Sequence, residues 1–169
     1  FGRWLRAMLL VEISAAHRYL IEQFLDPELN LRDDEWRDGA RFLGEVVRAV
    51  RAAARGLCVG IRLSADSVRA EGVAGLLADE GVDYLSLALG DSSTYLGSVG
   101  IVPPPPVPEA AVAPATAGFS VGVPRIATSR IRDVEVADRL LAEGVADAVG
   151  MTRALIADPD FPRKARDGQ

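Results

Sequence analysis

Two short segments in the second half of the chain combine glycine or hydroxyl side chains with arginine, a combination suited to binding an anion. The later segment contains, in order, Gly150, Met151, Thr152 and Arg153. Gly150 would let the backbone approach a ligand closely, and a helix beginning here would offer unpaired N–H groups. The earlier segment places Ser129 beside Arg130 in the same way. Taken singly, each segment could also be an ordinary turn between a strand and a helix. Together, the two segments are predicted to hold one phosphate.

The elements that must position these segments form a repeating pattern of short strands and helices. Five apolar runs are predicted to be strands, at 9–13, 58–63, 84–89, 125–127 and 148–151. Helical periodicity lies between most of them, with one apolar face over 42–50 and another over 136–141. This alternation implies parallel strands joined by crossover helices, and the largely apolar strands indicate a sheet covered on both faces.

The number of strands limits the fold. A complete eight-unit barrel takes about 250 residues, or roughly 31 per unit, so this chain has room for about five units. The predicted fold is therefore α/β, either a small open sheet or a partial TIM (β/α)8 barrel, with residues 1–169 as one domain. The first residues, 1–6, show no helix cap and no initiator methionine, which favours a barrel that lacks its first units.

One segment, 97–124, interrupts the pattern and is predicted to be irregular. It contains four consecutive prolines, Pro103 to Pro106, which are expected to form a stiff extended stretch. This segment is either a surface linker or a loop that shapes the mouth of a site.

Composition excludes several classes of protein. A net charge of −5 without a basic face argues against nucleic-acid binding. The sequence contains no run of eighteen apolar residues, which argues against a membrane span. A single cysteine, Cys58, and a single histidine, His17, argue against a disulfide framework and against a zinc site. A cytoplasmic setting is expected.

The motifs resemble, in order and spacing, the later part of the old yellow enzyme family of flavin-dependent oxidoreductases. The resemblance covers 11–27, 30–36, 59–64, 95–106 and the two anion-binding segments, and is closest to the branch with 2,4-dienoyl-CoA reductases and mycofactocin-associated oxidoreductases. It implies strands four to eight of an eight-stranded barrel that binds FMN at the carboxyl ends of its strands. It also implies reduction of an activated C=C bond with NAD(P)H as the reductant.

The resemblance assigns roles to individual residues. Arg62 is expected to lie near the pyrimidine edge of the flavin, although a strand-end salt bridge is the alternative. The phosphate would be held by Ser129, Arg130, Gly150, Met151, Thr152 and Arg153. Tyr19 falls on the proton donor, and His17 falls where relatives contact the substrate carbonyl or assist the donor. The alternatives are a tyrosine packed in the first turn of a helix and a solvated histidine.

Three departures from the family are visible. Ser14 stands where many relatives carry a second histidine, so the clamp on a substrate carbonyl is expected to be incomplete. Arg18 replaces a glycine and adds bulk and charge to the pocket. The turn at 37–39 is several residues shorter than usual, which is expected to alter the start of the following helix.

Two other functions remain open. A non-catalytic, truncated barrel remnant would leave strand edges exposed and would favour self-association. A different phosphate-binding β/α-barrel enzyme, such as an isomerase or synthase, would explain the anion-binding segments but not the motifs at 17–19 and 30–36.

Overall fold

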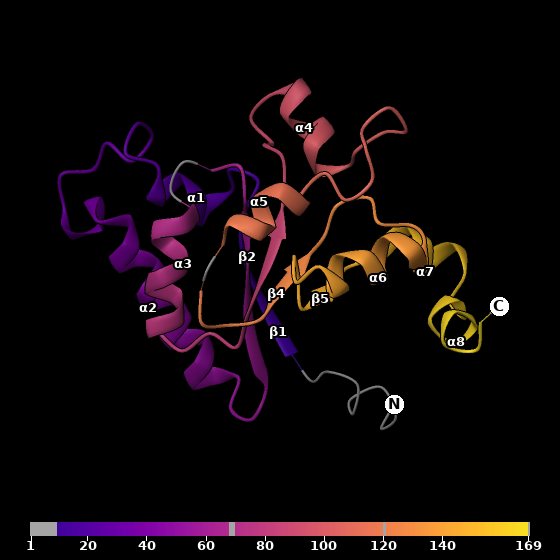
Figure 1. The fold of residues 1–169 in the computed structure, drawn as a ribbon. Helices are drawn as coiled ribbons and strands as arrows, with labels where there is room; N and C mark the ends of the chain where they lie inside the picture. The colour runs from indigo at the N-terminus through magenta and orange to yellow at the C-terminus, as the bar shows by residue number, and fades with distance from the viewer. Residues whose placement is uncertain (1–9, 68–69, 120, 169) are drawn as a thin grey trace.

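The computed structural model describes residues 10–67, 70–119 and 121–168, and its centre is one parallel sheet (Figure 1). The strands are β1 (Leu10–Ala15), β2 (Cys58–Ser64), β3 (Tyr84–Ala88), β4 (Arg125–Ala127) and β5 (Ala148–Val149). They lie in the order β1-β2-β3-β4-β5, and every neighbouring pair is parallel. A doubly wound open sheet reverses its strand order, whereas this sheet does not. The prediction of a partial β/α barrel with five units is therefore confirmed. The predicted Leu9 start of the first strand and the uncapped residues 1–6 lie outside the described residues.

Helices follow the strands, and α4 and α8 project away from the sheet (Figure 1). They are α1 (Leu20–Leu25), the 3-10 helix η1 (Glu35–Arg37), α2 (Gly39–Ala53), α3 (Ala70–Asp79), α4 (Tyr95–Ile101), α5 (Ala113–Gly118), α6 (Val134–Ala142), α7 (Thr152–Ala157) and α8 (Phe161–Arg166). Within the part of the chain that the structure describes, no helix combines the length and apolar composition needed to cross a membrane.

The prediction of an irregular segment at 97–124 was only partly right. Helix α4 continues through its first residues, and α5 lies within it. The four prolines do not form a continuous extended stretch, because the backbone turns there and the Val107 N–H donates to the Pro104 carbonyl at 3.0 Å.

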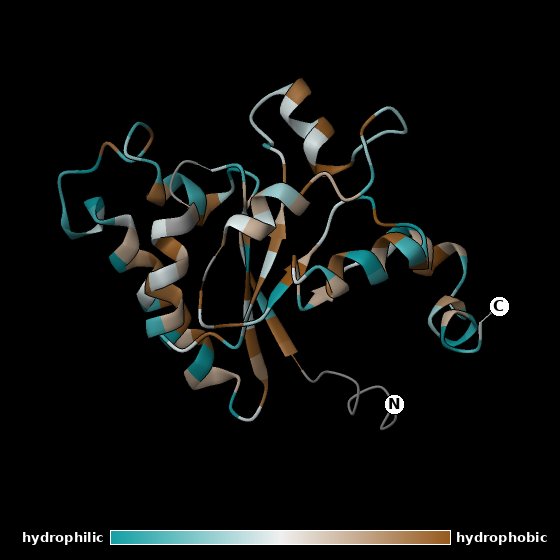
Figure 2. Cartoon of the chain, in the orientation of Figure 1, coloured by the Kyte–Doolittle hydropathy of each residue, from teal (hydrophilic) through white to brown (hydrophobic). Residues whose placement is uncertain are grey.

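One face of the sheet forms the hydrophobic core. Residues at alternate positions of β1, β2 and β3 are buried against the helices, since the side-chain period of a strand is two. These residues are Ile13, Ala15, Val59, Ile61, Leu63, Leu85 and Leu87, and they cluster with Leu43 and Val47 of α2 and Leu77 of α3. Figure 2 shows the brown apolar side of α2 and α3 alongside these strands.

The opposite face of the same strands carries several polar groups, although β3 is buried along its whole length, as expected of a sheet covered on both faces. The strand register puts Ser14 beside Arg62 and Arg62 beside Ser86. Glu12 lies on the same face, one register step away beside Gly60. Because barrels alternate outward and inward side chains along each strand, this is the face that would line the interior of a barrel.

Helix α2 begins directly after its short preceding turn. The Asp38 carboxylate accepts hydrogen bonds from the backbone N–H groups of Ala40 and Arg41, at 3.0 and 3.3 Å, and caps the helix. Gly39 lies so close to α1 that a Cβ atom there would be 2.0 Å from the Phe24 carbonyl oxygen. The shortened turn is therefore accommodated by an aspartate cap and a glycine, and a helix start that differs from that of the family stays a prediction.

Candidate functional site

The two anion-binding segments lie side by side at the carboxyl edge of the sheet. Strands β4 and β5 pair in parallel, with Ala127 opposite Val149, and the Gly150 N–H donates to the Ala127 carbonyl at 2.9 Å. The bend that contains Ser129 therefore meets the bend that begins at Gly150. The prediction that both segments hold one phosphate requires the two bends to be neighbours, and in the structure they are.

Gly150 and Ser129 make this junction suitable for a small anion. A Cβ atom at Gly150 would lie 2.5 Å from the Thr128 Oγ1 atom, so only glycine lets the two bends approach this closely. Ser129 is 5% exposed, and its hydroxyl oxygen has no hydrogen-bond partner among the described residues. A buried hydroxyl without a partner is costly, and a bound anion would provide one.

The arginines of the two bends are held by a loop rather than by acidic residues. The Arg130 guanidinium donates to the Val107 carbonyl, and that of Arg153 donates to the Pro103 carbonyl at 3.4 Å. Neither guanidinium forms a salt bridge within the described ranges, so its charge has no carboxylate partner there. The proline-containing loop thus contacts the candidate site, as the second interpretation of this segment predicted.

The helix ends contribute less to this site than the sequence indicated. Asp133 caps α6 by accepting a hydrogen bond from the Val136 N–H at 2.8 Å, so that N–H already has a partner. Helix α7 does begin at Thr152, directly after Met151, but it is only six residues long. The anion-binding character of the site therefore rests on the bends and the arginines.

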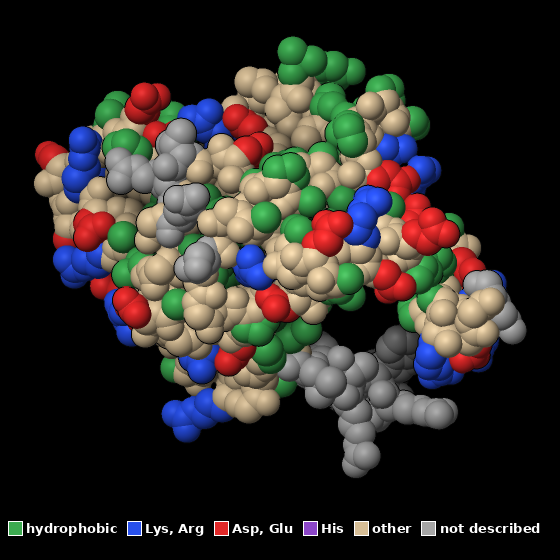
Figure 3. Space-filling view, in the orientation of Figure 1, with side chains coloured by type: hydrophobic (Ala, Val, Ile, Leu, Met, Phe, Trp, Pro, Cys, Tyr) green, Lys and Arg blue, Asp and Glu red, His purple; other side chains and the backbone are tan. Residues whose placement is uncertain are grey.

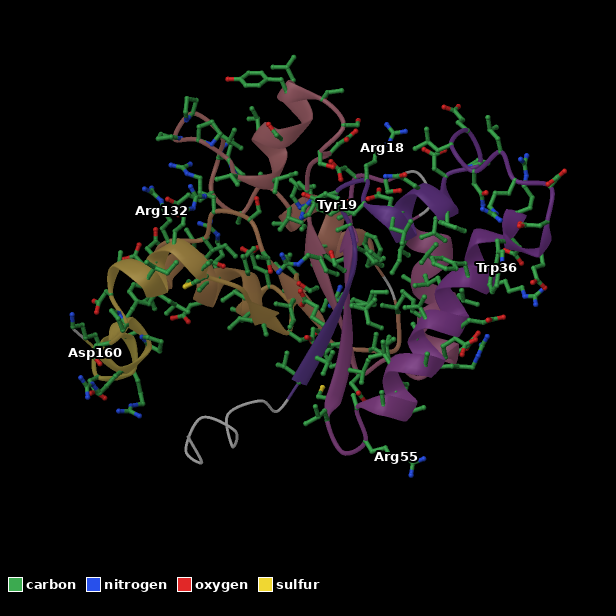
Figure 4. The ribbon with its side chains drawn as sticks, turned by 180° about the vertical axis from the view of Figure 1, so that it is seen from behind. Arg18, Tyr19, Trp36, Arg55, Arg132 and Asp160 are labelled. Atoms are coloured by element: carbon green, nitrogen blue, oxygen red, sulfur yellow. The ribbon has the colours of Figure 1, made fainter. Side chains whose placement is uncertain are left out.

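His17 and Tyr19 follow β1 at the same edge of the sheet. His17 is 8% exposed, which rules out the solvated histidine, whereas Tyr19 is 54% exposed and does not pack inside the first turn of α1. Their rings meet edge to face, with centroids 6.4 Å apart. Figure 4 shows Arg18 and Tyr19 beyond the end of β1, below the tip of α4, with Arg132, which follows the β4 bend, to the left of them.

Arg18 is tied to neighbouring carboxylates. Its backbone adopts a φ of 59°, its N–H donates to the Glu22 carboxylate at 2.7 Å, and its guanidinium pairs with Asp26 at 2.9 Å and Asp91 at 3.4 Å. Hydrogen bonds from Ser93, together with Arg18, hold the pKa of Asp91 below its ordinary value. The extra charge predicted for this pocket is therefore neutralised locally.

Arg62 lies on the polar face of β2, two residues before the strand ends. Its Nε atom is 3.1 Å from a carboxylate oxygen of Glu12, so the salt-bridge alternative is confirmed. That Nε atom is nevertheless buried without a properly directed hydrogen bond. Its position on this face is compatible with a flavin ring, but a role toward a cofactor stays a prediction.

Tyr84 lies beside these two partly exposed residues and is itself buried. Burial, and then the negative charge of Glu12, raise the pKa of Tyr84 to about 12. Gly60 makes room for the phenol ring, because a Cβ atom there would lie 2.0 Å from the Tyr84 Cζ atom. The sequence analysis did not identify Glu12 and Tyr84 as neighbours of Arg62. Polar residues at alternate positions of the strands could have indicated a shared polar face.

Replacing Glu12 with glutamine should lower the pKa of Tyr84. The substitution removes a negative charge that disfavours the phenolate, while burial continues to raise the pKa. Ultraviolet absorbance during an alkaline titration would show the last tyrosine ionising at a lower pH than in the wild type. The Tyr84→Phe variant identifies that transition, and an unchanged midpoint would mean that Glu12 does not act on the phenol.

Comparison with known proteins agrees with this geometry. Residues 9–89 match the family model described as the NADH:flavin oxidoreductase / NADH oxidase family. The N,N-dimethylglycine/sarcosine dehydrogenase of Chromohalobacter salexigens is 33% identical, over 94% of this chain and 25% of that protein. The NADH oxidase of Thermoanaerobacter brockii is 30% identical, over 94% of this chain and 26% of that protein. The NADPH dehydrogenase of Geobacillus sp. is 31% identical, over 92% of this chain and 47% of that protein.

Solved structures show the same fold. A 2-naphthoyl-CoA reductase in complex with 2-naphthoyl-CoA superposes with a TM-score of 0.83 at 24% identity, over 95% of this chain and 26% of that chain. A histamine dehydrogenase from Rhizobium sp. 4-9 superposes with a TM-score of 0.81 at 23% identity, over 98% of this chain and 26% of that chain. The chain thus spans between a quarter and a half of the length of the relatives named above. Residues 9–89 thus match the NADH:flavin oxidoreductase / NADH oxidase family, and over more than nine tenths of its length the chain is similar to proteins named NADH oxidase and NADPH dehydrogenase.

Proposed function

We propose that this chain is the phosphate-binding portion of an FMN-dependent NAD(P)H oxidoreductase. The observation that carries the proposal is the junction of the β4 and β5 bends, where the buried Ser129 hydroxyl lacks a partner beside the close approach at Gly150. Arg130 and Arg153 would supply positive charge to the phosphate, and the backbone at Met151 and Thr152 would face it. These residues fit a phosphate monoester such as the tail of FMN.

The polar face of the sheet suits the rest of such a cofactor. FMN, when bound, would supply hydride transfer between NAD(P)H and the substrate. Arg62 would place a fixed positive charge beside the ring, and Glu12 would hold its guanidinium in place at 3.1 Å. A guanidinium at that edge favours the more negatively charged state of a flavin, so Arg62 would assist reduction.

The proposed substrate is a compound with a C=C bond activated by a neighbouring carbonyl group. Tyr19 is half exposed at the carboxyl edge, where its phenol can give a proton to the substrate. The structural neighbour 2-naphthoyl-CoA reductase and the NADPH dehydrogenase relative support a reductive role. The N,N-dimethylglycine/sarcosine dehydrogenase relative shows that the family also contains proteins named for amine substrates.

A comparison of FMN with riboflavin tests the phosphate site directly, because only FMN carries the phosphate. Quenching of flavin fluorescence should show FMN binding about 100-fold more tightly than riboflavin, on the basis of about 1.5–3 kcal/mol for each charge-assisted hydrogen bond. The Arg130→Ala/Arg153→Ala double variant should lose most of that preference. Arg132→Ala is the matched control, because Arg132 pairs with Glu109 instead. Equal binding of FMN and riboflavin by the wild type would refute the phosphate assignment.

The reaction is tested with the flavin-loaded protein. Adding NADPH or NADH should bleach the flavin absorption band, and adding 2-cyclohexenone under anaerobic conditions should restore it. A folded protein that binds no flavin, and that associates with itself in size-exclusion chromatography, would instead support the non-catalytic barrel remnant. Bleaching without reoxidation by any activated C=C compound would point to another substrate class.

A further inference from the structure

The segment 103–110, which lies between α4 and α5, contacts both arginines of the candidate phosphate site. Its Val107 carbonyl accepts a hydrogen bond from the Arg130 guanidinium. Its Pro103 carbonyl accepts one from the Arg153 guanidinium at 3.4 Å. A guanidinium has five N–H donors, so each arginine keeps further donors for a ligand. Because a main-chain carbonyl carries no net charge, the segment can orient the two guanidiniums without neutralising them as a carboxylate would.

The same segment holds the backbone of the β4 bend. The Ala110 N–H donates to the Ser129 carbonyl at 3.0 Å, and the Ala110 carbonyl accepts from the Ala113 N–H at 2.8 Å, where α5 begins. Ala110 and Arg130 have φ values of 53° and 46°, two of the four positive values among the non-glycine residues that the structure describes. Such conformations are unfavourable for a residue with a Cβ atom and persist only where surrounding contacts enforce them. The contact between the segment and the bend is therefore constrained from both sides.

The middle of the segment is stiffened by proline. Pro104, Pro105 and Pro106 are exposed, and the Val107 N–H donates to the Pro104 carbonyl at 3.0 Å, which closes a turn. A proline ring fixes φ at about −65°, so this turn has few alternative conformations. Since the three rings are exposed, their contribution here is a restricted backbone that carries the Val107 carbonyl, rather than packing in the core.

We propose that the segment 103–110 is a positioning element that sets the directions of the Arg130 and Arg153 guanidiniums before a phosphate binds. A free arginine side chain has many rotamers and loses this freedom when it binds a ligand. Here the segment already restricts both side chains, so less freedom is lost on binding. The inference rests on the proposed function for the identity of the ligand, whereas the contacts that carry it lie within this chain.

Replacing two exposed prolines with glycine tests the segment without removing either carbonyl that contacts an arginine. In Pro105→Gly/Pro106→Gly the backbone before Val107 becomes flexible. Quenching of flavin fluorescence should then show FMN affinity falling by about tenfold, the cost of immobilising two long side chains, and riboflavin affinity unchanged. Unchanged FMN affinity would overturn the proposal. Equal losses for FMN and riboflavin would indicate a general loosening of the fold and would overturn it as well.

Pro159→Gly/Pro162→Gly is the matched control. It also replaces two exposed prolines with glycine, at the start of α8, which projects away from the sheet (Figure 1). Both flavin affinities of this variant should match those of the wild type. A tenfold loss of FMN affinity in the control would show that the effect does not depend on the segment 103–110, and would overturn the proposal.

A double-mutant cycle shows whether the segment acts through the arginines. In an Arg130→Ala/Arg153→Ala background no guanidinium is left to position, so Pro105→Gly/Pro106→Gly should have almost no further effect on FMN affinity. Additive losses would show that the segment acts on FMN in another way, and would overturn the proposal.

Nuclear magnetic resonance separates this inference from the proposed function, because it needs no ligand. In the free wild type, rotation about the Cζ–Nη bonds of Arg130 should be slowed by the hydrogen bond to Val107. In Pro105→Gly/Pro106→Gly the rotation should be faster, and equal rates would overturn the proposal. Equal affinities of the wild type for FMN and riboflavin, with the expected difference in rotation, would refute only the proposed function.

Discussion

Replacing Gly150 with alanine should reduce the affinity for FMN by about 100-fold or more. The new methyl carbon would lie 2.5 Å from the Thr128 Oγ1 atom and 3.1 Å from its Cγ2 atom, so the β4 and β5 bends must move apart. This movement would separate the Ser129 hydroxyl from the backbone at 150–153, and a phosphate could no longer contact both. The loss corresponds to about 3 kcal/mol, or two charge-assisted hydrogen bonds. Titration of flavin fluorescence measures it.

Two further variants make this result specific. Gly122→Ala is the control, because a Cβ atom there meets nothing within 4 Å, and its FMN affinity should match that of the wild type. Thr128→Ala removes Oγ1 and Cγ2 and leaves the Thr128 Cβ atom, 3.2 Å from the added methyl, as the nearest of the three contacts. FMN affinity should therefore recover in the Gly150→Ala/Thr128→Ala double variant. Normal FMN affinity in Gly150→Ala alone would show that the close approach of the bends is not needed for binding.

Replacing Gly60 with alanine should destabilise the folded chain by about 3 kcal/mol, the upper end of the usual range for overpacking. The added carbon would lie 2.0 Å from the Tyr84 Cζ atom and 2.3 Å from both Cε atoms. The ring has little room to move, because Tyr84 is 6% exposed and lies beside Glu12 and Arg62 on the polar face of the sheet. Urea denaturation measures the free energy of unfolding.

The cause can be isolated with a double-mutant cycle. In a Tyr84→Ala background the ring is absent, so adding Gly60→Ala should have almost no further effect on the free energy of unfolding. Gly75→Ala on α3 meets nothing within 4 Å and should be neutral or stabilising by up to about 1 kcal/mol. Additive effects of the Gly60 and Tyr84 substitutions would contradict the proposed collision.

Much of the architecture could be predicted because it depends on local patterns. Apolar runs bounded by turn residues placed all five strands within about two residues of their positions, and periodicity found α2 and α6. The β4 and β5 bends were also predicted correctly, because parallel strands that are neighbours in sequence place their carboxyl ends at one edge. The helices within 97–124 were missed, since the proline-rich composition there masks short helical turns.

The details of the candidate site depended on contacts between distant parts of the chain. Figure 3 shows apolar side chains gathered over α4 at the carboxyl edge, and Tyr95 and Leu96 of this helix are 88% and 79% exposed. Nothing in the local sequence distinguishes these exposed residues from core residues. Likewise, the exposure of Tyr19 and the burial of His17 depend on what packs above the strand ends.

The sequence by itself determined the five β/α units, their parallel order and the two bends with arginines, because each depends on periodicity and turn chemistry within a few residues. Only the tertiary structure decided that the sheet has a polar face, that Glu12 pairs with Arg62, and that the Nδ1 atom of His17 faces Gly90, 73 residues away. Such contacts follow from strand register and from the packing of loops across the sheet edge, which no local pattern specifies.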